Sequence, residues 1–180
     1  MKPREIESIN LSDFWLIKRT LFLFSEVNEH IAETLIKKIN LLDSKPQLPI
    51  TLMINSGGGS VHDGLSIINA IQACKSPIET VITGQACSTA GLIAIYGDTR
   101  RMHQHSVWMI HGIRSDLERG EFIHNAVSRT TYLNSLTDQI IDMYQERTKL
   151  KRDEIEAALI RELWLSPAQC VEKGVVEGII

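Results

Sequence analysis

Short apolar runs of strand length alternate with segments of helical periodicity along most of the chain, and this alternation limits the possible folds more than any other feature. Strand-like runs occupy residues 20–24, 50–55 and 78–84, and a segment of helical character follows each of them. Further short strands are expected near Met102 and at residues 107–111. Because repeated strand–helix units pack into a mainly parallel sheet layered with helices, we predict an α/β fold.

Capping residues indicate where several helices begin. Ser25 is the expected N-cap of the first helix, and Ser60, with Asp63 three residues later, resembles a capping box at the start of the second. A third helix is expected to begin at Ser88. The pair formed by Ser166 and the proline after it predicts the start of the last helix.

A long helix is predicted over about residues 121–148. Its apolar positions keep helical spacing while the remaining positions are polar, which is typical of a helix that packs on one partner surface. The apolar positions are Phe122, Ala126, Leu133, Leu136, Ile140 and Tyr144.

Composition excludes several classes of protein. The length of 180 residues is that of one domain, so a single domain over residues 1–180 is expected. The net charge of −3, without a long run of Lys or Arg, argues against nucleic-acid binding. The sequence shows neither a signal-peptide pattern nor an apolar stretch of membrane-spanning length, so a cytoplasmic protein without membrane contact is expected. The three cysteines lack metal-site spacing, so we expect reduced thiols, no metal and no cofactor.

Two strand-to-helix junctions are rich in small residues. The first, INSGGGSV at 54–61, has three consecutive glycines, which can adopt backbone conformations closed to other residues and let a ligand contact the backbone. The second, GQACSTAG at 84–91, places the hydroxyl of Ser88 at a helix start, where free N–H groups favour negative charge. Either junction alone is an ordinary tight turn. Together they could form an oxyanion hole, whereas the absence of a GxxxxGK[ST] pattern excludes a phosphate-binding P-loop.

One histidine is placed to serve as the base that a serine nucleophile needs. Of the six histidines, His111 ends an apolar strand and is followed by glycine. Side chains at the carboxyl ends of strands are often catalytic in α/β proteins. Taken by itself, this residue could equally be a hydrogen-bonded structural histidine.

The motifs INSGGGSV, GQACSTAG and MIHG, in this order and at these separations, resemble those of the Clp protease proteolytic subunit, a caseinolytic serine peptidase family. The resemblance extends from about Asp13 to the end of the chain and includes the segment LSPAQCVEKGVVEGI. It implies a spiral of ββα units with a protruding handle helix, a fold shared with the crotonase superfamily. It also implies stacked heptameric rings that enclose a proteolytic chamber, cleave peptides and unfolded proteins, and work with an AAA+ unfoldase.

The resemblance assigns site residues by position. Ser88 becomes the nucleophile and His111 the general base, while the backbone N–H groups of Gly59 and Thr89 become the oxyanion donors. The family's aspartate precedes an aromatic-Leu-Ser segment, which is WLS here, so the third triad position falls on Glu162. Glutamate carries the same charge as aspartate. Because its side chain is longer by one methylene, the backbone at this position must lie farther from the histidine for the carboxylate to occupy the same place. The alternative is a surface glutamate at a helix end.

The resemblance also implies a substrate cleft and a handle. Gly58, Gly112, Ile113 and Arg114 become substrate-binding residues, and the segment 112–120 becomes a strand and turn along the cleft. The helix over 121–148 becomes the handle that interlocks the rings. The sequence departs from the family pattern in having Gly57 where proline is usual, and Gly112-Ile113 where a Gln-Pro pair is usual.

Three classes of function therefore remain open. The first is a self-compartmentalised serine endopeptidase, and the second is a non-catalytic ring subunit of the same family, which a poor third triad residue would favour. The third is a crotonase-like acyl-CoA enzyme that holds a thioester oxyanion on the glycine loop, although this function gives no role to the Ser88–His111 pair. A Ser-Lys peptidase is a weaker variant, because no lysine lies between Lys75 and Lys149.

Overall fold

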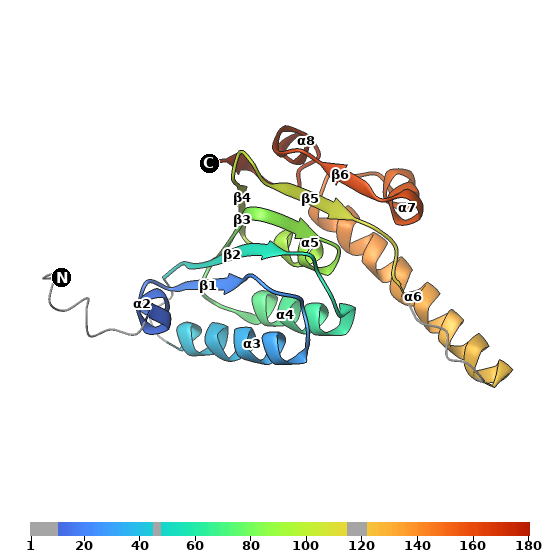
Figure 1. Cartoon of the computed structure of the whole chain (residues 1–180), viewed down its shortest axis with the longest axis horizontal. Coiled ribbons are helices and arrows are strands. Elements are labelled where there is room, and N and C mark those ends of the chain that lie inside the picture. The colour runs from blue at the N-terminus through green and yellow to red at the C-terminus, as the bar shows by residue number, and fades with distance from the viewer. Residues whose placement is uncertain (1–10, 45–47, 115–121) are drawn as a thin grey trace, which may run out of the picture.

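The computed structural model describes residues 11–44, 48–114 and 122–180 of the chain. Figure 1 shows a layered arrangement of strands and helices with one long helix that projects from the body. The helices are α2 (Leu11–Ile17), α3 (Glu29–Asp43), α4 (Val61–Ala73), α5 (Thr89–Ala94), α6 (Ile123–Arg147), α7 (Arg152–Arg161) and α8 (Pro167–Glu172). The strands are β1 (Thr20–Leu23), β2 (Ile50–Ser56), β3 (Ile78–Cys87), β4 (Thr99–Met102), β5 (Val107–Ile110), β6 (Leu163–Leu165) and β7 (Gly178–Ile179).

The strands form one sheet that is parallel except at a single pairing. Strands β1, β2, β3, β4 and β7 are neighbours in that order, and β5 pairs with β3 on one side and with β6 on the other. Only the β5–β6 pairing is antiparallel among the described strands. The predicted α/β class, with a mainly parallel sheet and intervening helices, is thereby confirmed.

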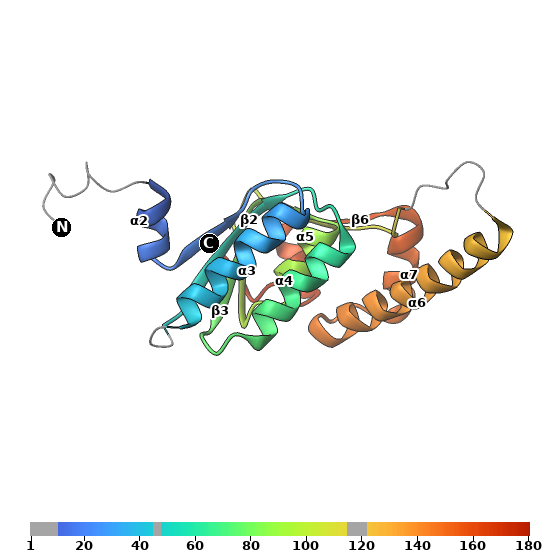
Figure 2. The ribbon, with the colours of Figure 1, turned by 90° about the horizontal axis from the view of Figure 1, so that it is seen from below.

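Helices α3 and α4 cover one face of the sheet, as Figure 2 shows. The alternation along β1 follows from this cover, since Leu21 and Leu23 are buried while Phe22 and Phe24 on the other face are partly exposed. Trp15 of α2 packs edge-to-face on Phe22, with ring centroids 5.4 Å apart. One face of the first strand therefore belongs to the core, and the other carries a row of aromatic rings.

All but one of the predicted N-cap residues lie at the start of a helix. Ser60 accepts a hydrogen bond from the N–H of Asp63, and Ser166 precedes the proline that begins α8. The prediction of Ser25 as the first N-cap is wrong, because Asn28 caps α3 by accepting the N–H of Ile31 at 3.0 Å. Before Asn28 the chain pairs with the glycine loop, where the N–H of Val27 donates to the carbonyl of Gly58 at 2.8 Å.

The long helix α6 begins at Ile123 and ends at Arg147, within the predicted range; residue 121 lies outside the described residues. The C-terminal half of α6 packs on the body, and its N-terminal half extends away from it (Figure 1). Leu136, Ile140 and Tyr144 are accordingly buried, whereas Phe122 at the helix start is 78% exposed. The apolar positions of this segment thus have two different surroundings. Those in the C-terminal half of α6 pack on the body of the chain, and the one at the helix start is exposed to solvent.

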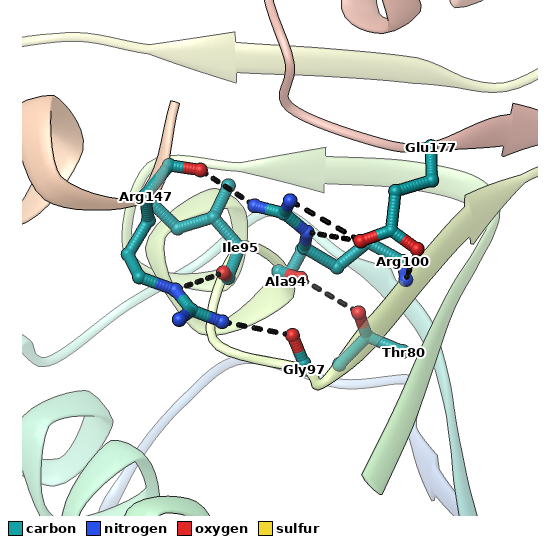
Figure 3. A network of polar contacts seen from close by, with 7 residues as sticks. All are labelled: Thr80, Ala94, Ile95, Gly97, Arg100, Arg147 and Glu177. Atoms are coloured by element: carbon teal, nitrogen blue, oxygen red, sulfur yellow. Dashed lines mark hydrogen bonds and ion pairs between the residues drawn. The ribbon is translucent and has the colours of Figure 1, made fainter. Parts of the chain in front are cut away.

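Arginine side chains tie the end of α6 to the sheet (Figure 3). The guanidinium of Arg147 donates to the carbonyl oxygens of Ile95 and Gly97, at 3.0 and 2.9 Å, which satisfies the carbonyl end of α5. The backbone carbonyl of Arg147 in turn accepts from Arg100, whose guanidinium also pairs with Glu177 at 3.3 Å. This network holds α5, α6 and the C-terminal strand in one unit.

Four elements were not predicted from the sequence, namely α2, α7, β6 and β7. Each is short or has weak periodicity, and β6 and β7 have only three and two residues. In the described part of the chain, no helix has the length and apolarity needed to cross a membrane.

Candidate active site

The carboxyl ends of β2, β3 and β5 meet at one edge of the sheet. Ser56 of β2 pairs with Ala86 of β3, and Cys87 of β3 pairs with Met109 of β5. The glycine loop, Ser88 and His111 each follow directly after one of these strands, so parallel pairing brings all three together. Sequence reasoning predicted each residue at a strand end, and the structure shows that the three ends are adjacent.

Ser88 has a strained backbone. Its φ of 55° and ψ of −127° are rare for a residue with a side chain. The surroundings hold this conformation, because the N–H of Ser88 donates to the carbonyl of Met109 at 2.8 Å and α5 begins at the next residue. Strain of this kind persists only where the surrounding structure enforces it, and it is concentrated at functional sites.

Glycines allow the two junctions to touch. A Cβ on Gly58 would lie 2.6 Å from the carbonyl oxygen of Cys87 and 2.8 Å from the Cβ of Ser88. Gly58 and Gly59 also have positive φ values, of 94° and 147°. On the far side of Ser88, a Cβ on Gly91 would lie 3.0 Å from the indole nitrogen of Trp108. The small residues around Ser88 are therefore required by close approach on both sides.

The glycine loop is held by hydrogen bonds to the hydroxyl groups of Ser56 and Thr89. The N–H of Gly58 donates to the hydroxyl of Ser56 at 3.1 Å, and that hydroxyl donates to the carbonyl of Ser25. The hydroxyl of Thr89 donates to the carbonyl of Gly59 at 3.0 Å. The loop and the start of α5 are thus fixed relative to each other.

The two predicted oxyanion donors both line one cleft. No described residue accepts a hydrogen bond from the backbone N–H of Gly59 or of Thr89. Thr89 is the first residue of α5, where N–H groups lack intrahelical partners and the helix dipole is positive. A preorganised pair of such donors stabilises developing negative charge on a substrate oxygen.

The cleft has a volume of about 770 Å³ and contains nearly all of the predicted site residues. Ser88 and His111 line it together with the predicted substrate-binding residues. Those residues are Gly58, Gly112, Ile113 and Arg114. Residues 112–114 form no strand, contrary to the prediction for 112–120, whose remaining residues lie outside the described ones.

Helix α6 and the start of α4 supply cleft residues that the sequence analysis did not assign. Leu133, Leu136 and Ile140 form an apolar wall, and their helical spacing was the signal that could have indicated it. His62 also lines the cleft, and its Nε2 lies 2.6 Å from the hydroxyl of Tyr132 on α6. This contact joins the glycine-loop side of the cleft to the long helix.

The predicted acid, Glu162, lies beside the cleft but does not line it. The antiparallel pairing of β5 with β6 ends at Ile110 and Leu163, so His111 and Glu162 are the first residues beyond the last paired position. The Glu162 carboxylate pairs with Arg114 at 3.4 Å and accepts the indole N–H of Trp164 at 3.2 Å. Among the described contacts it has no hydrogen bond with His111.

The cysteine next to Ser88 is not suited to act as a nucleophile. Burial, with a smaller contribution from the Glu162 carboxylate, raises the pKa of the Cys87 thiol. The thiol therefore stays protonated at neutral pH, and the thiolate is the reactive form. Among the described residues, no cluster of three or more His, Cys, Asp or Glu side chains could hold a metal ion.

Comparison with known proteins identifies the class to which this fold and site belong. Residues 3–180 match the family model described as Clp protease. ATP-dependent Clp protease proteolytic subunit 1 of Chlamydia muridarum is 33% identical, covering 92% of this chain and 88% of that protein. The ATP-dependent Clp protease proteolytic subunits of Nephroselmis olivacea and Deinococcus radiodurans are 30% and 28% identical, each over 90% of this chain, with 78% and 80% of their own lengths covered.

The chain therefore belongs to the Clp protease family. The resemblance found from its motifs, and the fold class that the resemblance implied, are both confirmed.

Substitution by alanine should have very different effects on stability at the neighbouring residues Gly57 and Gly58. We expect Gly58→Ala to lower the free energy of unfolding by at least about 2 kcal/mol, because a Cβ there collides with backbone atoms and φ is positive. Gly57→Ala is the matched control, since its Cβ would meet nothing within 4 Å, and a change within about 0.5 kcal/mol is expected. Urea unfolding of both variants measures the difference; equal stability would contradict the close approach of the loop to Ser88.

Proposed function

We propose that this protein is a Clp-type serine endopeptidase in which Ser88 is the nucleophile and His111 the general base. The observation that carries the proposal is the convergence of Ser88, His111 and the glycine loop on one cleft, at the ends of three adjacent parallel strands. Family membership supports the reaction class. The substrates would be peptides and unfolded polypeptides, which can enter an open cleft as extended chains.

The residues of the cleft suit acyl transfer in two steps. His111 takes the hydroxyl proton of Ser88 as its oxygen attacks the peptide carbonyl, and the N–H groups of Gly59 and Thr89 stabilise the oxyanion that forms. The imidazolium then gives its proton to the leaving amine, and an ester to Ser88 remains. A water molecule, activated by His111 in the same way, hydrolyses that ester and restores the serine.

Glu162 would complete a Ser-His-Glu triad. The feature that supports this role is that Glu162 and His111 both lie directly beyond the last pair of the β5–β6 register. A carboxylate there accepts the imidazole N–H, selects the tautomer that can receive the serine proton, and stabilises the imidazolium. The contacts of Glu162 with Arg114 and Trp164 favour a second candidate function, a non-catalytic ring subunit whose acid is engaged elsewhere.

Assembly into stacked heptameric rings, with α6 as the handle between rings, is part of the proposal. Support comes from apolar side chains that this chain alone leaves in solvent. On α6 and at its start they are Phe122, Ile123 and Val127, with exposed fractions of 78, 79 and 59%. An AAA+ unfoldase is the proposed partner, because the relatives are named as subunits of ATP-dependent proteases.

Covalent labelling separates the candidate functions. We expect an active-site fluorophosphonate to label purified protein on Ser88, because an adjacent base activates that hydroxyl. The variants Ser88→Ala and His111→Ala should lose the label, whereas Ser66→Ala, a change at an exposed serine of α4 that does not line the cleft, should keep it. Peptide mass mapping locates the modified residue. Absence of label on Ser88, together with uncleaved short peptides, would favour the non-catalytic subunit.

Glu162→Gln tests the third triad position. We expect peptide hydrolysis to fall by about 10²-fold or more, because removal of the carboxylate from a known triad costs about 10⁴ in turnover. The particle size should not change, and size-exclusion chromatography provides that control. Wild-type turnover in this variant would mean that a Ser-His dyad suffices or that another residue supplies the acid.

The exposed apolar positions on α6 predict a large particle. Light scattering at micromolar concentration should give a mass many times that of the 20.3-kDa chain. Val127→Glu should shift the particle toward smaller species, since a charge would have to be buried in the proposed contact between rings. A monodisperse monomer of the wild-type protein would refute the assembly.

A further inference from the structure

Arg114 lies where the cleft meets the candidate acid. The residue lines the cleft next to Gly112 and Ile113, and its Nη2 lies 3.4 Å from Oε1 of Glu162. The side chain of Arg114 is 81% exposed, against 40% for that of Glu162. The guanidinium is therefore open to solvent and to anything that occupies the cleft.

The contact between Arg114 and Glu162 is of a kind that exchanges easily. A guanidinium has five N–H donors and prefers to pair with a carboxylate through two of them, but only one contact to Glu162 is within hydrogen-bond distance. Ion pairs exposed to solvent add little to stability. The Oε2 atom of Glu162 stays held by Trp164 when Oε1 is released. A second carboxylate could thus replace Glu162 as the partner of Arg114 at little cost.

The charges along the cleft favour an acidic group at this end. Among the described residues that line it, Arg114 carries the one permanent positive charge. The negative charge of Glu26 lies beside the glycine loop, since its Cγ would be 2.9 Å from a Cβ on Gly59. The other titratable groups among the described lining residues are His62, His111 and Tyr144. Along the described lining, an extended peptide would therefore meet a permanent positive charge only at Arg114.

We propose that Arg114 is a specificity-determining residue that pairs with a carboxylate of the bound peptide, in exchange for Glu162. The inference rests on the proposed peptidase function, because it concerns how the same cleft selects its substrates. The carboxylate belongs either to an Asp or Glu side chain or to the C-terminus of a short peptide.

The exchange would also couple substrate binding to the triad. When a substrate carboxylate takes the guanidinium, Oε1 of Glu162 loses its partner, and Glu162 and His111 remain next to the last pair of β5 and β6. The released oxygen can then accept the imidazole N–H. In this respect Arg114 is a positioning residue for Glu162. The carboxylate of the bound peptide favours the state in which Glu162 can accept the imidazole N–H of His111.

The test measures peptide binding without turnover, in protein carrying Ser88→Ala. Fluorescent peptides of one sequence are compared by anisotropy with Glu or Gln at each position in turn, all with an amidated C-terminus. A third set has Gln and a free C-terminus, which separates a side-chain carboxylate from a terminal one. We expect at least one acidic peptide to bind about fivefold to tenfold more tightly than its neutral partner, as for one charge-assisted pair.

Four further variants decide the assignment. Arg114→Gln should abolish the acidic preference and Arg114→Glu should reverse it toward a Lys-containing peptide, whereas Arg161→Gln should retain it. Arg161 is the matched control, since it is an exposed arginine next to Glu162 that does not line the cleft. Glu162→Gln should increase the acidic preference by about threefold or more, because it removes the carboxylate that competes for the guanidinium.

Each outcome of these measurements bears on the proposal. Equal affinities for acidic and neutral peptides, a preference that survives in Arg114→Gln, or a preference that is unchanged in Glu162→Gln would overturn it. Failure of every peptide to bind would overturn it as well. An Arg114-dependent preference in protein whose Ser88 form cleaves no peptide would instead sustain the specificity role and refute the peptidase function alone.

Discussion

The pairing of β3 with different partners along its length is the constraint on which the rest of the structure depends. Its first half pairs with β4 through residues 79–82, and its last three residues pair with β5. The strand also pairs with β2 along most of its length. The ends of β2, β3 and β5 consequently meet at one edge, and the turns after them form the candidate site. A shift of one residue in this register would turn the side chains to the opposite face of the sheet.

Close packing around Ser88 then fixes the geometry of the turns that follow these strands. Gly58 contacts the backbone beside Ser88 on one side, and Gly91 accepts the indole N–H of Trp108 on the other. Trp108 is fully buried, so this bond forms away from water, where an unpaired donor would be costly. The positive φ of Ser88 is thereby enforced by contacts on both sides. Such enforcement keeps the hydroxyl and the neighbouring N–H groups in place before any substrate binds.

The candidate acid differs in kind from the rest of the site. Ser88, His111 and the glycine loop are held by strands and close contacts, whereas Glu162 follows α7 with a φ of 59° and its carboxylate is held by exposed side chains. The glutamate side chain, which is one methylene longer than that of aspartate, contacts Arg114 and Trp164. A tightly held part of the candidate site therefore adjoins a carboxylate that is held only by exposed side chains, and the exchange proposed for Arg114 concerns this second part.

The amino-acid sequence by itself determined the alternation of strands and helices from β1 to α6, the two junctions of small residues and the strand end at His111. These features depend on local periodicity, on turn chemistry and on motifs, and all can be read over a few residues. The short strands β6 and β7 could not be read in this way, because their pairing partners are distant in the chain. Helix α3 is capped by Asn28 and not by Ser25, because Val27 forms a bridge to Gly59 of the glycine loop. Only the tertiary structure decided that α6 would form a wall of the cleft, and that Glu162 would contact Arg114, 48 residues away in the sequence. Both depend on how separate elements pack, which spacing along the chain does not specify.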